Sequence, residues 1–230
     1  RNECVPTVRT EHAIATLLDA YRQGINIPSL RDAYPGMVAE VKRLSLRSPD
    51  QCLEASGDFW ALGQLAEELG MTEDAFRWTK RGEEIFDSIW PKEVQNINET
   101  YTKMRGNGLY QGTRWQYRWG APMYLPRMIE MAGKKELGEQ LQTFFHKELY
   151  NQGNEPDIHV PFLFGRLGMP QITGNIVRSL ATESITHRYG GNDAYPTPFN
   201  GCAFANQPRG YCPEMDEDDG AMSAWYVFAS

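Results

Sequence analysis

The chain has 230 residues, which is enough for one domain or at most two. Hydrophobic residues make up 41% of it, so a full core can form, and no stretch approaches the ~20 apolar residues of a membrane-spanning helix. The formal net charge is -7 and no cluster of Lys or Arg occurs, which argues against nucleic acids and anionic membranes as partners.

Periodic apolar residues predict a series of helices along the chain. Glycine ends several of them, at Gly24, Gly70 and Gly133, and Pro28 prevents the first from continuing. Thr72 is predicted to cap the helix that contains Trp78 and Ile85. The apolar stripes that define these helices are Ile14, Leu17, Leu18 and Tyr21; Leu62, Leu65, Ala66 and Leu69; Trp78, Gly82, Ile85 and Ile89; Met123, Met128, Ile129 and Met131; and Leu137, Leu141, Phe144 and Phe145.

Long polar loops are predicted at 91–112 and 187–213, and no strand-period pattern extends beyond a few residues. Long loops of this kind are usually functional or disordered. The predicted class is therefore all-α, with residues 1–230 forming one helical domain of antiparallel hairpins. By analogy, consecutive hairpins of this kind often close into an α/α toroid.

The four cysteines, at 4, 52, 202 and 212, match neither a zinc site nor a redox Cys-x-x-Cys pair. A bridge between Cys202 and Cys212 would staple the loop that contains both. Asn98-Glu99-Thr100 is an N-glycosylation sequon, which has meaning only in a secreted protein. The sequon and the even cysteine count together favour a secreted protein or one of the secretory pathway.

The run from Gly153 to Phe164 places acidic, amide and imidazole side chains ahead of an apolar segment. One interpretation is structural: Asn154 caps a helix whose first turn holds Pro156, Glu155 and Asp157 complement the helix dipole, and His159 packs in the core. The other interpretation is acid/base chemistry on a neutral, oxygen-rich substrate, which needs a second carboxyl group at a distance.

A second acidic cluster, Asp216 to Asp219, supplies that candidate partner. Four consecutive acids are either a solvated loop or a site for a hard cation such as calcium, which takes oxygen ligands in irregular geometry. Gly220 turns the chain into the apolar segment 221–228, which would hold the cluster on the scaffold. Gly190 to Asp193, a third polar group, is interpreted as a turn.

The two runs together resemble glycoside hydrolase family 92, the exo-α-mannosidases. The first resemblance lies in Gln152-Gly153-Asn154-Glu155-Pro156-Asp157-Ile158-His159-Val160-Pro161-Phe162-Leu163-Phe164, and the second in the acidic turn followed by Gly220-Ala221-Met222-Ser223-Ala224-Trp225-Tyr226-Val227-Phe228. Weaker matches in the same order cover most of the chain, among them Trp115-Gln116-Tyr117 with Trp119, and Leu53-Glu54 with Asp58-Phe59.

The resemblance implies an (α/α)6 catalytic domain, which in the family follows an N-terminal β-sandwich, and a calcium-dependent reaction. It implies Glu155 as the general acid, with Asp218 and Asp216 as the general base and as calcium ligands. Asn154, Asp157 and His159 are implied as substrate-binding or orienting residues. Terminal α-mannosides of N-glycans or mannan are the implied substrate, hydrolysed with inversion.

The chain also departs from the family pattern. The β-sandwich is not in it, and a loop usual in the family is missing after Leu46. Gln111 stands where the family has Glu, Met123-Tyr124 replaces a His-Asp pair, and the chain stops at Ser230, in mid-helix by family standards. These departures are compatible with part of a longer enzyme or with absent segments. They are equally compatible with a catalytically impaired mannose-binding or scaffold homologue. A toroid glycosidase acting on another sugar is a third reading.

Overall fold

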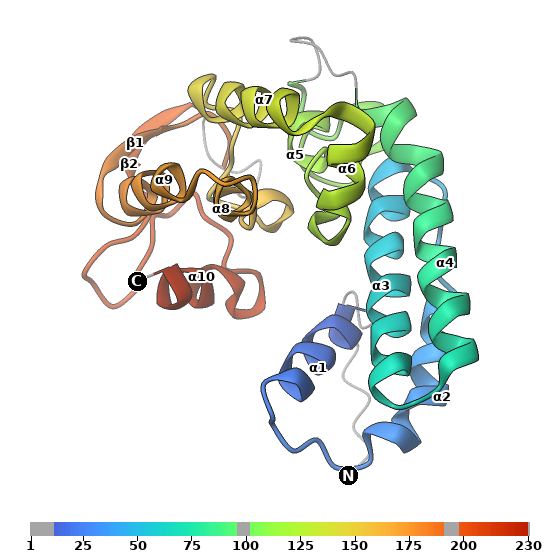
Figure 1. The fold of residues 1–230 in the computed structure, drawn as a ribbon. Helices are drawn as coiled ribbons and strands as arrows, with labels where there is room; N and C mark the ends of the chain where they lie inside the picture. Colours follow the sequence, from blue (N-terminus) through green and yellow to red (C-terminus); the bar gives the residue numbers. More distant parts are fainter. Residues whose placement is uncertain (1–11, 96–101, 191–197, 230) are drawn as a thin grey trace. The chain divides into compact units, whose positions relative to one another are not determined.

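The computed structural model describes residues 12–95, 102–190 and 198–229, apart from the side chains of Asn107 and Asp219. The chain forms two compact units, unit 1 over residues 1–93 and unit 2 over residues 94–230. The described residues are mostly helical, which confirms the all-α class (Figure 1). The single domain over 1–230 and its closure into a toroid stay predictions.

The described residues of unit 1 form four α-helices. They are α1 (Ala13–Arg22), α2 (Leu30–Val41), α3 (Pro49–Glu68) and α4 (Thr72–Ile89), and the π-helical turn Trp90–Val94 follows α4. The predicted stripes of α1, α3 and α4 are confirmed, because Leu18, Leu62 and Ile85 lie in one apolar core. Helix α2, with Pro35 inside it, was not predicted. Thr72 is the first residue of α4, so its predicted capping role is wrong: Met71 occupies the cap position, without a side-chain hydrogen bond.

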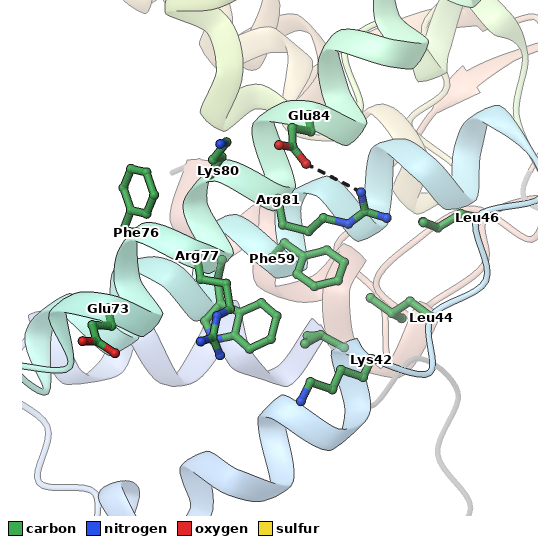
Figure 2. Close-up of a pocket in the computed structure, with 12 residues that line it drawn as sticks. Lys42, Leu44, Leu46, Phe59, Glu73, Phe76, Arg77, Lys80, Arg81 and Glu84 are labelled. Carbon is green, nitrogen blue, oxygen red and sulfur yellow. Dashed lines mark ion pairs between the residues drawn. The ribbon is translucent and has the colours of Figure 1, made fainter.

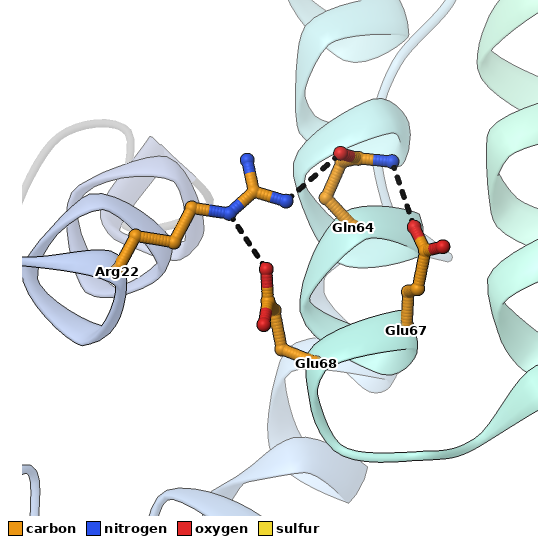
Figure 3. Close-up of polar contacts among 4 residues, drawn as sticks. All are labelled: Arg22, Gln64, Glu67 and Glu68. Carbon is orange, nitrogen blue, oxygen red and sulfur yellow. Dashed lines mark hydrogen bonds and ion pairs between the residues drawn. The ribbon is translucent and has the colours of Figure 1, made fainter.

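Helices α3 and α4 pack closely along an antiparallel pair (Figure 1). Gly63 lies at their closest approach, where an added Cβ would stand 2.8 Å from the backbone nitrogen of Thr79. Helix α1 packs on α3 through the apolar core, and Arg22 adds polar contacts to the same helix. The Arg22 Nε donates to Glu68 at 2.8 Å and its Nη2 donates to Gln64 at 2.9 Å (Figure 3).

Unit 2 contains shorter elements joined by tight turns. Its α-helices are α5 (Arg114–Tyr117), α6 (Leu125–Ala132), α7 (Lys134–His146), α8 (Leu163–Arg166), α9 (Pro170–Thr182) and α10 (Ala221–Ala229). Its 3-10 turns are Gly106–Gly108, Pro122–Tyr124, Glu155–Asp157, Val160–Phe162 and Asp218–Gly220. The predicted stripe in α7 is confirmed by the burial of Leu137, Leu141 and Phe144. The stripe predicted for α6 is confirmed only in part, because Met128 is buried but Met123 lies in the preceding 3-10 turn. Within the described residues, no helix is long and apolar enough to cross a membrane.

A β-hairpin replaces part of the loop predicted at 187–213. Strand β1 (Ser184–His187) pairs antiparallel with β2 (Phe199–Cys202), in a register that sets Ile185 opposite Gly201. The His187 ring stacks on Phe199 with centroids 4.4 Å apart. Four-residue strands are too short to show a period in the sequence, so the prediction of a structureless loop was wrong here.

The cysteines described in the structure, Cys52, Cys202 and Cys212, are free thiols. The bridge considered between Cys202 and Cys212 is therefore not formed. Instead, the backbone N–H of Cys212 donates to the carbonyl of Ala203 at 2.8 Å, which ties the two ends of this loop together. The sequon at Asn98 and residues 191–193 of the predicted turn lie outside the described residues.

The segment 155–166 is not the continuous helix that its capping residues suggested. A 3-10 turn at Glu155–Asp157 is followed by a second at Val160–Phe162 and then by α8. Pro161 explains the interruption, because it has no N–H to donate to the carbonyl four residues earlier.

Candidate active site

A groove of about 730 Å³ in unit 1 contains none of the predicted site residues (Figure 2). It runs along α4, where Lys42 and Arg77 both lie over the Trp78 ring, at 5.7 and 5.6 Å from its centroid. Arg81 pairs with Glu84 at 3.8 Å, as the dashed line in Figure 2 shows. Alternating charges of this kind are typical of a solvated helix face.

The predicted general acid stands on a polar, hydrogen-bonded segment of unit 2. Asn151, Gln152, Asn154 and Asp157 are all buried, whereas Glu155 is exposed. The Asn151 side chain accepts the N–H of Gly153 at 2.9 Å and donates to the carbonyl of Gly190 at 3.3 Å. The buried amides thus fix the backbone and leave the Glu155 carboxyl on the surface.

The Asn154 side chain makes hydrogen bonds to both Glu155 and Gln111. Its Oδ1 accepts the backbone N–H of Glu155 at 2.9 Å, which confirms the predicted cap, although of a 3-10 turn. Its Nδ2 donates to Oε1 of Gln111 at 3.2 Å. Gln111 therefore contributes to the placement of the acid through one intermediate side chain.

Asp157 is fully buried beneath the 3-10 turn that it ends. Its Oδ2 accepts the backbone N–H of Asn151 at 2.9 Å. Burial raises the pKa of the Asp157 carboxyl well above its usual range, although the hydrogen bond from Asn151 opposes the shift. In the structure Asp157 holds the turn; direct contact with a substrate stays a prediction.

His159 is held by one hydrogen bond to the backbone. Its Nε2 donates to the carbonyl of Trp119 at 2.7 Å, since a carbonyl can only accept. Burial lowers the pKa of His159, so the ring is neutral near pH 7 and Nδ1 is an acceptor. A neutral imidazole with a fixed tautomer suits an orienting role towards a hydroxyl group.

The acidic cluster forms a tight turn at the start of α10. Asp218 has a positive φ of 47° and Gly220 one of 97°. Glu217 caps the turn, accepting from the backbone N–H of Gly220 and from the Ser223 hydroxyl at 2.7 Å. The Ser223 hydrogen bond lowers the pKa of the Glu217 carboxyl. Glu217 is therefore a capping residue in the structure, and the roles predicted for Asp216 and Asp218 stay predictions.

The two predicted motifs lie side by side in unit 2. The backbone N–H of Asp216 donates to the carbonyl of Gly153 at 3.0 Å. Below this contact, Nε1 of Trp225 donates to the carbonyl of Ile158 at 2.8 Å, and the Trp225 ring stacks on Phe204 with centroids 5.7 Å apart. Two hydrogen bonds thus join the segment that carries Glu155 to the segment that carries Asp216 and Asp218.

Among the described residues, no group of three or more His, Cys, Asp or Glu side chains is arranged to hold a metal ion. Asp216 and Asp218 are both half-buried and provide hard oxygen donors, the type that calcium prefers. The donor chemistry thus fits calcium, and these two carboxylates would be one part of a ligand set.

Sequence reasoning missed the residues that hold the site together. Asn151 lies two residues before Gly153, a spacing typical of a side chain that bonds the backbone two residues on. That signal was in the sequence. The contacts of Trp225 with Ile158 and of Asn154 with Gln111 join positions far apart in the chain, and no local pattern reports them.

Solved structures of family members resemble this fold. One, described as the structure of the GH92 family glycosyl hydrolase ccman5, has a TM-score of 0.82 and 26% sequence identity, over 99% of this chain and 36% of that chain. A second, the family GH92 alpha-mannosidase BT3965 from Bacteroides thetaiotaomicron, has a TM-score of 0.71 and 21% identity, over 94% of this chain and 31% of that chain. The same enzyme in complex with mannoimidazole gives a TM-score of 0.72 and 20% identity, over 94% of this chain and 32% of that chain.

The chain therefore spans about a third of the length of the solved proteins that it matches. A search of curated proteins found no match. The model of the glycosyl hydrolase family 92 catalytic domain matches residues 40–193, which is more than half of the chain. The chain belongs to glycosyl hydrolase family 92.

Proposed function

We propose that this chain carries the acid and base of an inverting exo-α-mannosidase. The observation that carries the proposal is the direct contact between the two carboxyl-bearing segments, the 3.0 Å hydrogen bond from Asp216 N–H to the Gly153 carbonyl. Membership of family 92 and the similarity of the fold to a family alpha-mannosidase support the choice of sugar.

In this mechanism Glu155 donates a proton to the glycosidic oxygen as the leaving group departs. Asp218, assisted by Asp216, removes a proton from the water that attacks the anomeric carbon from the opposite face. Such an inverting pair requires the two carboxyl groups to stand ~6.5–9.5 Å apart, which leaves room for the water. The exposure of Glu155 lets it reach a substrate, and Asn154 and His159 would orient the substrate beside it.

Calcium is part of this proposal. Asp216 and Asp218 would contribute ligands to the ion, and sugar hydroxyls or water would supply others. A bound calcium ion would neutralise negative charge and help to place the hydroxyls of the sugar. Calcium titration followed by intrinsic fluorescence, in the wild type and in Asp216→Asn, tests this assignment without relying on turnover.

The proposed substrates are the terminal α-mannosides of N-glycans or mannan, and the proposed location is extracellular or within the secretory pathway. Because the chain spans about a third of its relatives, the complete site is expected to need a β-sandwich domain or a second chain segment as a partner. No nucleic acid or membrane partner is proposed.

A second candidate function is mannose binding without turnover. It is favoured by Gln111, whose neutral amide accepts from Asn154 at the position where the family pattern has a carboxylate. An amide there cannot take up or release a proton. A Gln111→Glu variant that gains mannose release over the wild type would support this candidate.

The central experiment replaces Glu155 with Gln. We expect release of mannose from an aryl α-mannoside to fall by about 10²–10⁴-fold, because the proton donor is lost. Glu130→Gln, an exposed carboxylate paired with Arg127 at 3.8 Å, is the matched control and should retain activity. Unchanged turnover in Glu155→Gln would remove it from the mechanism. Release from aryl β-mannosides instead would point to the opposite anomeric specificity, and release from other aryl glycosides to a different sugar.

A further inference from the structure

Unit 2 contains a pocket of about 430 Å³ between the end of α7, helix α9 and strand β1. We call it the α9–β1 pocket and define it by Phe145, Glu148, Tyr150, Gln152, Ser184 and His187. Its volume lies in the range of small-molecule sites in proteins. None of Glu155, Asp216 and Asp218 lines it.

Gln152 brings an unsatisfied amide to the α9–β1 pocket. The residue is only 1% exposed, and its Oε1 accepts from the Tyr150 hydroxyl at 2.6 Å. Its Nε2 has no hydrogen-bond partner among the described residues. Reversing the amide would leave the oxygen in the same situation, so one polar atom stays unsatisfied either way. A buried unsatisfied polar group is destabilising, and a bound hydroxyl group would offset that cost.

His187 adds an acceptor of fixed tautomer. Its Nε2 donates to the carbonyl of Gly201 at 3.1 Å, and burial lowers its pKa, so the ring is neutral near pH 7 and Nδ1 can accept. The flat stack of His187 on Phe199 holds the ring in place. Gln152 and His187 are thus a donor and an acceptor among the residues that line the pocket.

The charge and the aromatic rings narrow the ligand class. No Lys or Arg is among the described residues that line the pocket, and Glu148 is the one acidic residue among them, so an anionic ligand would be disfavoured. Phe145 and Tyr150 stack on each other at 5.1 Å and form an apolar wall. Aromatic rings beside hydrogen-bonding groups are the combination that accommodates a sugar, which has apolar C–H faces and polar edges.

We propose that the α9–β1 pocket is a second sugar site, which binds one neutral pyranose residue. This proposal goes beyond the hydrolytic site, and it rests on the proposed function only in the choice of mannose as the probe. Gln152 lies three residues before Glu155 on the same hydrogen-bonded segment. A sugar held at Gln152 would therefore contact the segment that positions the acid.

The test is an NMR titration of the full chain carrying Glu155→Gln, which prevents turnover. Methyl α-mannopyranoside is the probe, and sodium sulfate is the anionic comparison. We expect shifts of the Gln152 side-chain amide with the sugar and none with sulfate. An oligomannoside in a separate titration distinguishes a free sugar from a glycan chain end, because the pocket binds the chain end more tightly only if its neighbouring residues also find contacts.

Two variants make the assignment specific. Ser184→Trp fills the pocket from its exposed rim, and we expect the dissociation constant at this site to rise at least tenfold. Thr182→Trp adds the same ring at an exposed position of α9 outside the lining, and it should bind as the parent does. Absence of Gln152 shifts with sugar, a sulfate response, or equal binding by both variants would overturn the proposal. If wild-type turnover fails while these shifts persist, only the hydrolytic function is refuted.

Discussion

The α3/α4 hairpin of unit 1 and the paired acidic segments of unit 2 are held by different interactions. The hairpin is two long helices whose apolar stripes meet, with Leu62 and Leu65 completely buried. The acidic segments contain short 3-10 turns, and around the first of these the buried side chains of Asn151, Asn154 and Asp157 bond to the backbone. The first arrangement tolerates many apolar sequences, whereas the second depends on individual hydrogen bonds.

The two regions should therefore respond differently to mutation. In the hairpin, the loss of stability caused by a substitution should depend on the change in side-chain volume, because packing between the two helices is the main interaction. In the acidic segments, the loss of one hydrogen-bonding atom should matter more than a change of volume, because each buried polar group needs its partner. Substitutions in both regions can test this contrast.

Gly63→Ala should produce the largest effect on stability. The added Cβ would stand 2.8 Å from the Thr79 nitrogen, so the two helices must separate. We expect unfolding free energy to fall by about 3 kcal/mol, the upper part of the range for overpacked cores, as measured by urea denaturation.

Gly36→Ala is the matched control for this change. Gly36 lies in α2, is exposed, and has no atom within 4 Å of an added Cβ. Alanine should there be neutral or stabilise by up to ~1 kcal/mol, because it favours the helix. Equal effects of the two substitutions would show that helix contact does not limit the hairpin.

Trp225→Phe removes one N–H and retains an aromatic ring. The Ile158 carbonyl would lose its donor, for an expected loss of about 2 kcal/mol in unfolding free energy. If this hydrogen bond also positions the acid, turnover of an aryl α-mannoside should fall about tenfold, as for ~1.4 kcal/mol in the barrier.

Phe204→Leu provides the contrast for Trp225→Phe. It weakens the ring stack on Trp225 but leaves the hydrogen bond to Ile158 intact. We expect a comparable loss of stability with turnover nearly unchanged. Similar losses of turnover in both variants would mean that Trp225 acts through packing alone.

The same contrast explains what could be predicted from the sequence. Helical stripes such as Leu137, Leu141 and Phe144 repeat locally, so α7 was predicted correctly. The candidate site residues could be named because Glu155 and Asp218 stand in long motifs. The hydrogen bond between the two motifs joins Gly153 and Asp216, which are 63 residues apart (216 − 153), and no local sequence pattern predicts a contact at that separation. The β1/β2 pairing was missed because its four-residue strands are too short to show a period.

Asp157→Asn should change the pH dependence of stability. Burial raises the pKa of this carboxyl above its ordinary value of 3.8, so the folded state binds the proton more tightly than the unfolded state does. Wild-type stability is then fully present below that ordinary value and falls as the pH rises towards the raised pKa, by up to ~1.4 kcal/mol per pH unit.

The amide introduced by Asp157→Asn cannot ionise, so the variant should lack this loss and gain on the wild type as the pH rises. Urea denaturation between about pH 4 and pH 8, a window that lies above the ordinary carboxyl pKa, measures the difference. A wild type that instead gains on the variant with rising pH would show that Asp157 is stabilised as the carboxylate.

Arg22→Ala should have the smallest effect. Arg22 joins α1 to Glu68 and Gln64 of α3, but the Arg22 and Glu68 side chains are 39% and 34% exposed, so water and salt screen the pair (Figure 3). We expect a loss of about 0.5 kcal/mol at low salt that shrinks as salt is added. Gln64→Ala removes the neutral partner and should show no such salt dependence. A loss above ~2 kcal/mol for Arg22→Ala would mean that single polar contacts govern unit 1 as well, and the contrast between the two regions would fail.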